Sequence, residues 1–588
     1  MRKTVFSRPE SKENHKRNSF DRSFVSNYNF SAGMLLPTFV KFCFGNSHVK
    51  INQRSFFRTA DVNTAAFPSL PHYTDYYFVP MHQIISGWND FRSLTNDRHS
   101  SKLPVPLTLP SFTVRDVRSC LNTTLASEWN DLCGFNRTWG SIRLLDLLGY
   151  GWNIGDVSMS SIFTTIFDNF PDFGSQNPLA LCAYQKVYYD HYRNTAYESN
   201  NVKRYNLDYL YGGSGDSCTP DFISTNELCD MMEMHYVNYR RDVFNTIYPS
   251  LNFISSRANP LNSVKFRLPA TVVGIGGIYQ GSILSNSITT PSVSSDGNAV
   301  APSSVAGPAG SAGGFTLQNL RASYALERLA RVSAFAPQHV IDQFEARFGY
   351  RPRSASMHES VRLGSFSNSI NIGEVTSTAQ TDPDASLGRL GSIGGKGVGA
   401  SDYENVITYD VPEDGFIIGV SYVLPRLQYD TNFVSQINQQ FAPEDWSLPE
   451  FDNLSLQPVL RKHVCLEHST SESTQDDRDT KDVLVGNAIL GYTPRDMQYK
   501  AEVSVNHGLF NAGFPLSIFT THGKRKSYFS RYLNDGLSAA YFKCTPSDLD
   551  DIFVEQADGQ ENSDQFFGQI VVSFACIQDK PIFGIPSI

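Results

Sequence analysis

The sequence has few charged residues and no long apolar run. Charged residues make up 18% of the 588 residues, below the usual share of about 25%. No stretch approaches the roughly 20 consecutive apolar residues that cross a bilayer. The N-terminus carries charges but lacks the apolar segment of a secretory signal. These absences predict a protein that is made in a cytoplasm and has no membrane insertion.

Paired cysteine motifs are also missing. The nine cysteines lie far apart, their number is odd, and no Cys-x-x-Cys occurs. Small secreted proteins with a disulfide framework show the opposite pattern. We therefore expect no disulfide framework and a fold that forms in a reducing compartment.

Glycine-rich nucleotide motifs are present only in incomplete form. "GSIGGKG" (Gly391–Gly397) lacks the P-loop glycine, where Leu390 stands, and the magnesium-binding Ser or Thr, where Gly397 stands. "GIGGIYQG" (Gly274–Gly281) has Tyr279 in place of the third glycine of a dinucleotide fingerprint. Neither segment predicts a cofactor.

Catalytic and metal-binding motifs are absent as well. The sequence contains no His-Glu-x-x-His and no Gly-x-Ser-x-Gly. The acidic clusters at 476–479 and 548–551 lack EF-hand spacing and are typical of solvated loops. The sequence leaves open whether two carboxylates form a catalytic pair, because such residues meet only in the fold. We predict no enzyme, no cofactor and no metal site.

Aromatic residues are abundant, at 13% of the chain with 41 Phe and 28 Tyr. A charge-poor, ring-rich surface favours protein–protein contacts, although a large β core raises the aromatic count equally well. The strand-like "HYTDYYFVP" (72–80) carries rings on both faces, since successive side chains alternate. We expect one face to pack on an opposing sheet and the other to be covered by an insertion or an adjacent subunit. The candidate subunit-packing residues are Tyr73, Tyr76, Tyr77 and Phe78.

Strand patterns come from both ends of the chain. Period-2 alternation or β-rich composition predicts strands at 39–60 around a Gly45-Asn46 turn, at 415–429, at 498–507 and at 568–577. Helices are predicted near 227–237, over 316–335 with Thr316 as the N-cap, and from Pro337 to Gly349. Long excursions lie at about 85–270 (mixed), 281–314 (Ser/Gly/Ala-rich) and 467–482 (acidic). This order favours a β-sandwich with expanded loops over alternating βαβ units.

Two basic segments stand out from a chain of net charge −9. The arm 1–22 has seven basic and three acidic residues, and "HGKRKSYFSR" (522–531) places cations beside rings. Cations that neutralise phosphates and rings that stack on bases suit single-stranded nucleic acid. The alternative is a solvated loop and an arm that ties subunits together. The candidate nucleic-acid contacts are Lys12, Lys16, Arg17, Lys524, Arg525, Lys526 and Tyr528.

Several blocks together resemble one protein family, the major capsid protein of microviruses, which are small icosahedral single-stranded DNA bacteriophages. The resemblance is especially to the gokushovirus type and to microviruses associated with Bacteroidota. The blocks, in chain order, are "NSFDRSF" (18–24), "FSAGMLLP" (30–37), "RTADVNTAAFPSLPHYTDYYFVP" (58–80), "FTLQNLRASYALERL" (315–329), 339–375, "LGRLGSIG" (387–394), "EDGFIIGVSYVLPRLQY" (413–429) and "ILGYTPRDMQYK" (489–500).

The resemblance implies a mainly β fold, a single viral jelly-roll, which is an eight-stranded antiparallel sandwich or barrel with long helix-containing insertions. Residues 23–588 would form this domain after the arm. It implies a virion shell protein that builds a T=1, sixty-copy icosahedral capsid from itself. The shell would assemble in the bacterial cytoplasm around circular single-stranded DNA. Implied partners are phage scaffolding, pilot and small DNA-binding proteins and a host cell-surface receptor. The alternative function is a secreted carbohydrate-binding or hydrolytic β-sandwich protein.

Overall fold

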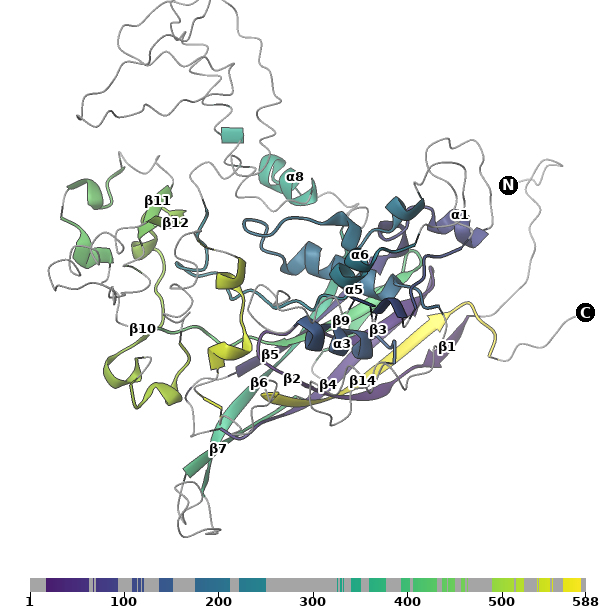
Figure 1. Ribbon diagram of the computed structural model, residues 1–588, viewed down its shortest axis with the longest axis horizontal. Coiled ribbons are helices and arrows are strands. Elements are labelled where there is room, and N and C mark those ends of the chain that lie inside the picture. The colour runs from purple at the N-terminus through teal and green to yellow at the C-terminus, as the bar shows by residue number, and fades with distance from the viewer. Residues whose placement is uncertain are drawn as a thin grey trace, which may run out of the picture. The chain divides into compact units, whose positions relative to one another are not determined.

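The fold is known from a computed structural model of the 588-residue chain (Figure 1). The chain forms two compact units, Met1–Ile247 with Ser354–Ile588, and Tyr248–Arg353, and each is described by itself. The structure describes residues 17–62, 67, 70–93, 108–113, 115–117, 119–120, 137–151, 175–211, 222–249, 325, 328–329, 332, 340–350, 359–376, 393–401, 405–430, 436–441, 443–449, 456–460, 463, 489–511, 514–522, 537, 539–549, 552–553 and 564–582.

One large antiparallel sheet dominates the first unit. Its strands run in the order β1-β14-β4-β7-β6-β5-β9-β3, with β2 also paired to β14 and β8 to β4. Their bounds are β1 (Asn18–Asp21), β2 (Phe24–Phe30), β3 (Leu36–Cys43), β4 (His48–Thr59), β5 (Leu70–Pro80), β6 (Val361–Thr376), β7 (Ile393–Ser401), β8 (Ile407–Asp410), β9 (Gly415–Val423) and β14 (Phe566–Gln578).

Ten strands occupy eight positions in this sheet. β1 and β2 pair with successive halves of β14, and β8 and β7 pair with successive parts of β4. Each of these two pairs therefore acts as one interrupted strand. The longest pairing joins β14 to β4, so the last strand of the chain lies between strands from its beginning. The prediction of strands from both ends of the chain is confirmed.

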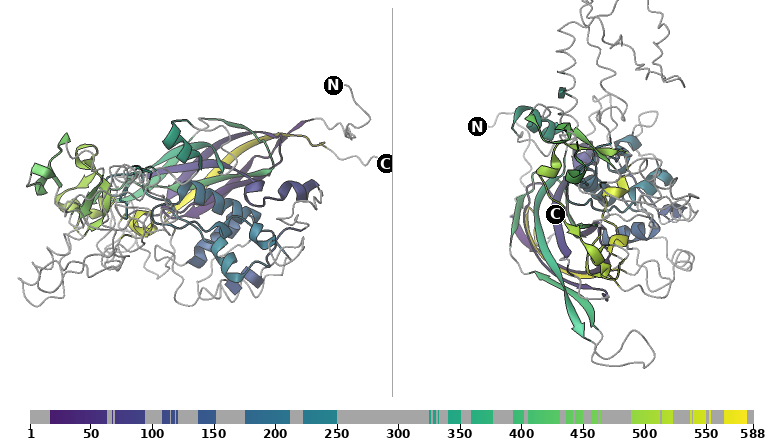
Figure 2. Two further views of the ribbon diagram at one scale, coloured as in Figure 1. Left: turned by 90° about the horizontal axis from the view of Figure 1, so that it is seen from above. Right: turned by 90° about the vertical axis from the view of Figure 1, so that its left-hand side faces the viewer.

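The sheet curls so that its two halves face each other (Figure 2). The ring of Phe39 on β3 meets the ring of Phe574 on β14, with centroids 5.2 Å apart. It also meets Tyr76 on β5 at 5.4 Å. Because β3 and β14 stand at opposite parts of the strand order, this contact requires a closed sandwich. The predicted jelly-roll with insertions is the observed fold.

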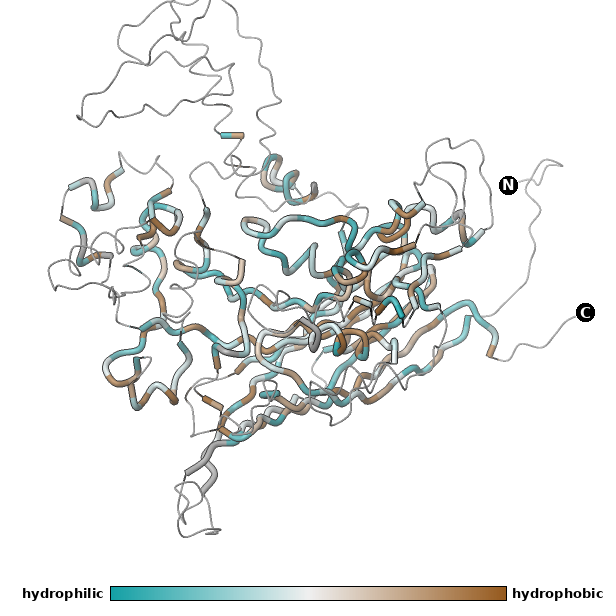
Figure 3. The backbone as a smooth tube through the Cα atoms, in the orientation of Figure 1, coloured by the Kyte–Doolittle hydropathy of each residue, from teal (hydrophilic) through white to brown (hydrophobic). Residues whose placement is uncertain are grey.

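Alternating hydropathy explains why β4 and β14 form strands with one buried face. Residues on β4 alternate between buried and exposed along most of its length, and β14 shows the same alternation. Figure 3 shows this as alternating colours along the two strands. The predicted turn before β4 is also present, with Asn46 at φ 64°, a backbone conformation that Asn tolerates better than most residues.

A helical insertion between β5 and β6 covers the half of the sheet made by β3, β5 and β9. In Figure 2 its helices lie together on one side of the sheet. α5 contacts β5 and β9, and α3 contacts β3. The bounds are α1 (Trp88–Ser93), α3 (Arg137–Leu147), α5 (Leu179–Val187), a π-helical turn (Tyr188–Tyr192) and α6 (Thr225–Met231).

Two predicted elements are wrong in extent. The helix expected over 227–237 begins after Ser224, which forms a capping box with Glu227, and ends at Met231. Beyond it the chain is extended, because the backbone of 235–239 bonds to other segments, including Gly33 and Phe542. The strand expected at 498–507 is reduced to β13 (Val505–Asn506), since a 3-10 turn occupies Met497–Tyr499.

Two small sheets lie in the C-terminal part of the first unit. β10 (Tyr429–Asp430) pairs with β13, and β11 (Leu456–Leu460) pairs with β12 (Ile489–Pro494). A second apolar cluster, which includes Phe244, packs beside them.

The described part of the second unit is mainly α8 (Val340–Phe348), which ends at Gly349 as predicted, with φ 72°. Nearly all of the helix-like block 315–329 and the excursions 281–314 and 467–482 lie outside the described residues. In the part of the chain that the structure describes, no helix is long and apolar enough to cross a membrane.

Candidate functional site

The inner face of β5 packs on the opposing half of the sandwich, as predicted. The Tyr76 hydroxyl donates to Gln53 Oε1 on β4 at 2.7 Å, and Gln53 Nε2 donates to the Thr74 hydroxyl at 3.1 Å. Tyr76 is fully buried, and burial raises the pKa of its hydroxyl above the ordinary value. It therefore remains a neutral donor that links the two halves of the sheet.

The outer face of β5 is covered by the insertion of the same chain. The ring of Tyr77 stacks on His191 with centroids 4.5 Å apart, and its hydroxyl donates to Tyr192 at 3.0 Å. Of the two covers that the sequence left open for this face, an insertion and an adjacent subunit, the insertion covers Tyr77.

The buried carboxylate of Asp75, next to Tyr77 on β5, accepts hydrogen bonds from three side chains. Asp75 accepts hydrogen bonds from the hydroxyls of Tyr192 and Tyr422, both at 2.9 Å. The Arg362 guanidinium on β6 donates to it at 2.7 Å. A buried carboxylate is stable only when it is paired and hydrogen-bonded, so these contacts fix the insertion on β5, β6 and β9.

The four predicted subunit-packing residues differ in exposure. Tyr76, Tyr77 and Phe78 are buried within one chain. Tyr73 is half-buried; its ring lies 5.5 Å from that of Tyr422, and the Arg240 guanidinium lies 5.2 Å from its centroid. A subunit contact at these rings stays a prediction, and Tyr73 is the most exposed of the four.

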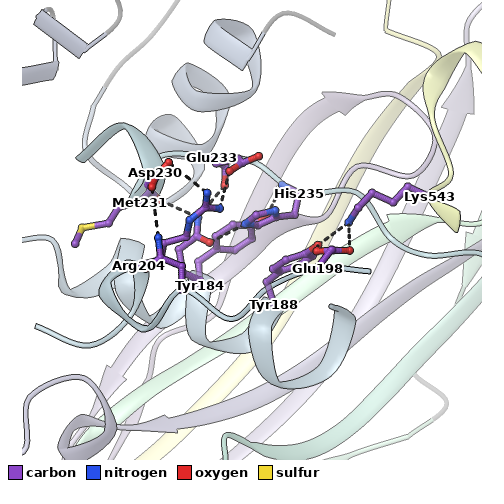
Figure 4. Close-up of polar contacts among 11 residues, drawn as sticks. Tyr184, Tyr188, Glu198, Arg204, Asp230, Met231, Glu233, His235 and Lys543 are labelled. Carbon is purple, nitrogen blue, oxygen red and sulfur yellow. Dashed lines mark hydrogen bonds and ion pairs between the residues drawn. The ribbon is translucent and has the colours of Figure 1, made fainter. Parts of the chain in front are cut away.

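A second buried polar cluster joins α5 to the extended segment after α6 (Figure 4). Gln185 Nε2 donates to the carbonyls of Met231 and Glu233, each at 2.8 Å. Its Oε1 lies 2.7 Å from His235 Nε2. The Tyr184 hydroxyl donates to the Leu35 carbonyl at 3.0 Å. The cluster therefore connects the insertion to the start of β3.

Lys543 extends this cluster to the C-terminal segment. Its ammonium lies 3.1 Å from Glu198 Oε1 and donates to the Tyr188 hydroxyl at 2.5 Å, which in turn bonds Glu198. Lys543 and Glu198 are both nearly buried. Burial, together with the nearby Glu198 charge, raises the pKa of Tyr188 well above its usual range. The three groups act as a tie between two segments far apart in sequence.

Arg204 forms the solvent-facing edge of the same cluster. It donates to Glu233 at 2.6 Å and to Asp230 at 3.2 Å. The clustered polar groups are thus satisfied mainly by each other. No sequence motif predicted these contacts, although Gln185 and Lys186 within the apolar run of α5 indicate buried polar contacts.

No catalytic arrangement emerges from these contacts. Among the described residues, no group of three His, Cys, Asp or Glu side chains could hold a metal ion. The buried carboxylates are held by hydrogen-bond donors of the same chain. The clusters around Asp75 and Gln185 therefore stabilise the packing of distant segments of the chain on each other.

Of the predicted nucleic-acid contacts, only Arg17 lies within the described residues. Its Nε lies 3.3 Å from Asp579 Oδ1, and it donates to the Asn46 carbonyl. Arg17 therefore joins the two ends of the chain at the β3–β4 turn. The other candidates lie outside the described residues: Lys12, Lys16, Lys524, Arg525, Lys526 and Tyr528.

One disulfide departs from the sequence expectation. Cys120 and Cys229 are bonded across 109 residues, within the insertion. Their separation carries no recognisable spacing, so the sequence could not reveal the pair. Cys43, Cys182, Cys544 and Cys576 are buried and take part in no disulfide.

Comparison with known proteins assigns the family. Residues 174–510 match the phage family described as "Capsid protein (F protein)". The match covers more than half of the 588-residue chain and includes α5, most of the buried polar cluster that contains Gln185 and His235, and β6 to β9. No curated protein matches the chain. The chain therefore belongs to the F capsid protein family of the Microviridae, a family of virion capsid proteins.

Proposed function

We propose that this protein is the major shell subunit of a microvirus, and that it builds a T=1 icosahedral shell around circular single-stranded DNA. The family match carries this proposal. The fold supports it, because a closed jelly-roll with an insertion fixed by buried polar contacts is a rigid building unit. The role is structural and involves no catalysis.

The physical basis is repeated contact between identical subunits. In a closed shell each subunit has several neighbours, so moderately favourable interfaces suffice. The exposed fractions of Phe222 (97%) and Phe441 (89%) show that large rings remain uncovered in the single chain. Such rings are suited to contacts with neighbours.

Further partners follow from the same proposal. Scaffolding, pilot and small DNA-binding proteins would act with the shell during assembly in the bacterial cytoplasm, and the outer surface would meet a host receptor. The basic segment with Lys524, Arg525 and Lys526 remains a candidate DNA contact. Replacing these three residues with glutamine is expected to reduce packaged DNA or particle stability, and unchanged packaging would count against that role.

Assembly can be tested directly. The protein is expressed with the scaffolding proteins of the same phage and followed by sedimentation velocity and negative-stain imaging. Oligomers of pentamer size or closed isometric particles are expected. A strictly monomeric protein under all these conditions would contradict the proposal. Glycan binding or hydrolysis by that monomer would instead favour a carbohydrate-active sandwich.

A further inference from the structure

The outside of the strands β2, β14, β4 and β7 forms a continuous face, which we call the outer-sheet face. Strand alternation places it opposite the buried core side chains of the same strands. Its residues are exposed or half-buried. They are Val25, Asn27 and Asn29 of β2; Phe567, Gln569, Val571 and Ser573 of β14; Lys50, Asn52, Arg54, Phe56 and Arg58 of β4; and Lys396, Val398 and Ala400 of β7.

Cations and rings alternate across this face. In the register, Arg58 stands opposite Phe567 on one side and Val398 on the other. Phe56 stands opposite Gln569 in the next row. Cross-strand side chains on one face lie about 5 Å apart at Cβ. The Arg58 guanidinium also lies 5.3 Å from the Phe56 ring centroid, so charge and ring form one surface.

The charge of the face has one sign. It carries Lys50, Arg54, Arg58 and Lys396, and none of its residues, as defined above, is acidic. Two carboxylates lie next to the face. Asp410 pairs with His48 in the register, at the far end of β4 from Arg58, and lies 2.7 Å from its Nδ1. Asp564 accepts a hydrogen bond from Asn29, but its side chain is nearly buried and is paired with Arg143 at 2.9 Å. A second copy presenting the same face would meet like charges.

The face also exposes large apolar groups. Phe567 is 49% exposed, Phe56 37% and Val398 47%. The contacts of α3 and α5 with the sheet are on β3, β5 and β9. Exposed rings beside cations are unusual on a surface that only water covers, and they mark an interaction site.

We propose that the outer-sheet face binds unpaired nucleotides of single-stranded nucleic acid. Bases stack on Phe56 and Phe567, and Arg58 and Lys396 neutralise the adjoining phosphates. A duplex fits less well, because its bases are already stacked and cannot reach the rings. The inference deepens the proposed function, since it assigns a surface of the shell subunit to the enclosed single-stranded DNA.

Binding of a fluorescein-labelled oligothymidylate to the full-length protein, measured by fluorescence anisotropy, tests this face. The double variant F56A/F567A is expected to bind at least about tenfold more weakly, because stacking contributes about 1–3 kcal/mol per base. The double variant R58Q/K396Q is expected to bind more weakly and to lower the slope of log K against log salt by about 1.4. Matched controls are Trp446→Ala, which removes a ring that is 46% exposed, and Lys500→Gln, which removes an exposed cation; both should bind as the wild type does. Unchanged thermal unfolding shows that each variant is folded.

Three outcomes would overturn the inference. Both face variants could bind the oligonucleotide like the wild type. The aromatic variant could be unaffected while duplex DNA or heparin competes as well as oligothymidylate, which indicates general polyanion binding. Oligonucleotide binding could be unchanged while self-association weakens, which indicates a subunit contact. Shell formation is followed separately by sedimentation. If particles form but the face does not bind the oligonucleotide, this inference fails and the proposed shell function stands. If the face binds the oligonucleotide but no particles form, the proposed shell function fails and the binding stands.

Discussion

The imidazole of His235 lies parallel to the phenol ring of Tyr188, with centroids 3.5 Å apart and planes 5° apart. His235 belongs to the extended segment after α6, whereas Tyr188 begins the π-helical turn after α5. Their contact joins two parts of the insertion, and Gln185 forms a hydrogen bond with His235 there. Lys543 donates to the Tyr188 hydroxyl at the same place (Figure 4). The polar contacts around this stack lead to the first prediction.

Lys543→Met is expected to destabilise the protein by about 3–5 kcal/mol, because it leaves the carboxylate of Glu198 buried without its cation. The double variant K543M/E198Q should recover most of this loss. Urea unfolding measures both. Lys203→Met is the matched control, since Lys203 pairs with Glu227 at the surface and its loss should cost about 0–1 kcal/mol. Equal losses for K543M and K203M would show that the buried pair has no special role.

The burial of the His72 imidazole predicts that the stability of the protein depends on pH. Its ring is fully buried with its centroid 4.0 Å from that of Phe57, and Nε2 has no hydrogen-bond partner. Burial lowers the pKa of His72 to about 3, whereas an unfolded histidine has a pKa of about 6.5. Below about pH 6.5 the imidazole of His72 binds a proton in the unfolded state but not in the folded state. The stability contributed by neutral His72 is therefore complete above about pH 6.5 and declines as the pH falls towards 3.

The size of this effect can be measured against a variant without the imidazole. Between pH 7 and pH 5 the wild type should lose roughly 2 kcal/mol more of its free energy of unfolding than His72→Leu does. Urea unfolding at both pH values gives the comparison. Because every other titrating group is common to the two proteins, parallel pH profiles would show that His72 is accessible to protons in the folded state.

Gly33 is predicted to tolerate no side chain. Its φ is 78°, and an added Cβ would lie 2.0 Å from the carbonyl oxygen of Cys544. The backbone at Gly33 also bonds Val423 and Val237, so the neighbouring segments have little room to move.

The matched control for Gly33→Ala is Gly149→Ala. Gly149 has φ 88°, and nothing lies within 4 Å of an added Cβ. That substitution should cost only the backbone strain, about 1–2 kcal/mol, and Gly33→Ala should cost clearly more. Thermal unfolding distinguishes the two variants. Equal shifts in Tm would mean that the backbone at Cys544 moves away from the added Cβ at little cost in stability.

Local patterns were sufficient to predict β4, β5, β9 and β14 and some ends of elements. Alternation on β4 and β14 marks their buried faces, and Asn46 and Gly349 stop elements where positive φ is needed. The cover of Tyr77 could be reduced to two alternatives, because rings on both faces of a strand require two packing partners. These predictions depend on residues close in sequence.

Contacts between distant segments could not be predicted in the same way. The pairing of β14 with β4 and the Cys120–Cys229 bond join residues with no shared local signal. The helix expected over 227–237 ends at Met231, because tertiary hydrogen bonds outweigh helix propensity beyond that point. Lys543 looks like a surface residue in sequence, and only the fold places it beside Glu198.

We propose above that this chain builds a closed shell. Negative-stain imaging of the protein, co-expressed with the scaffolding proteins of the same phage, shows whether it does. Isometric particles of uniform size are the predicted result. A protein that stays a folded monomer under the same conditions would contradict the account.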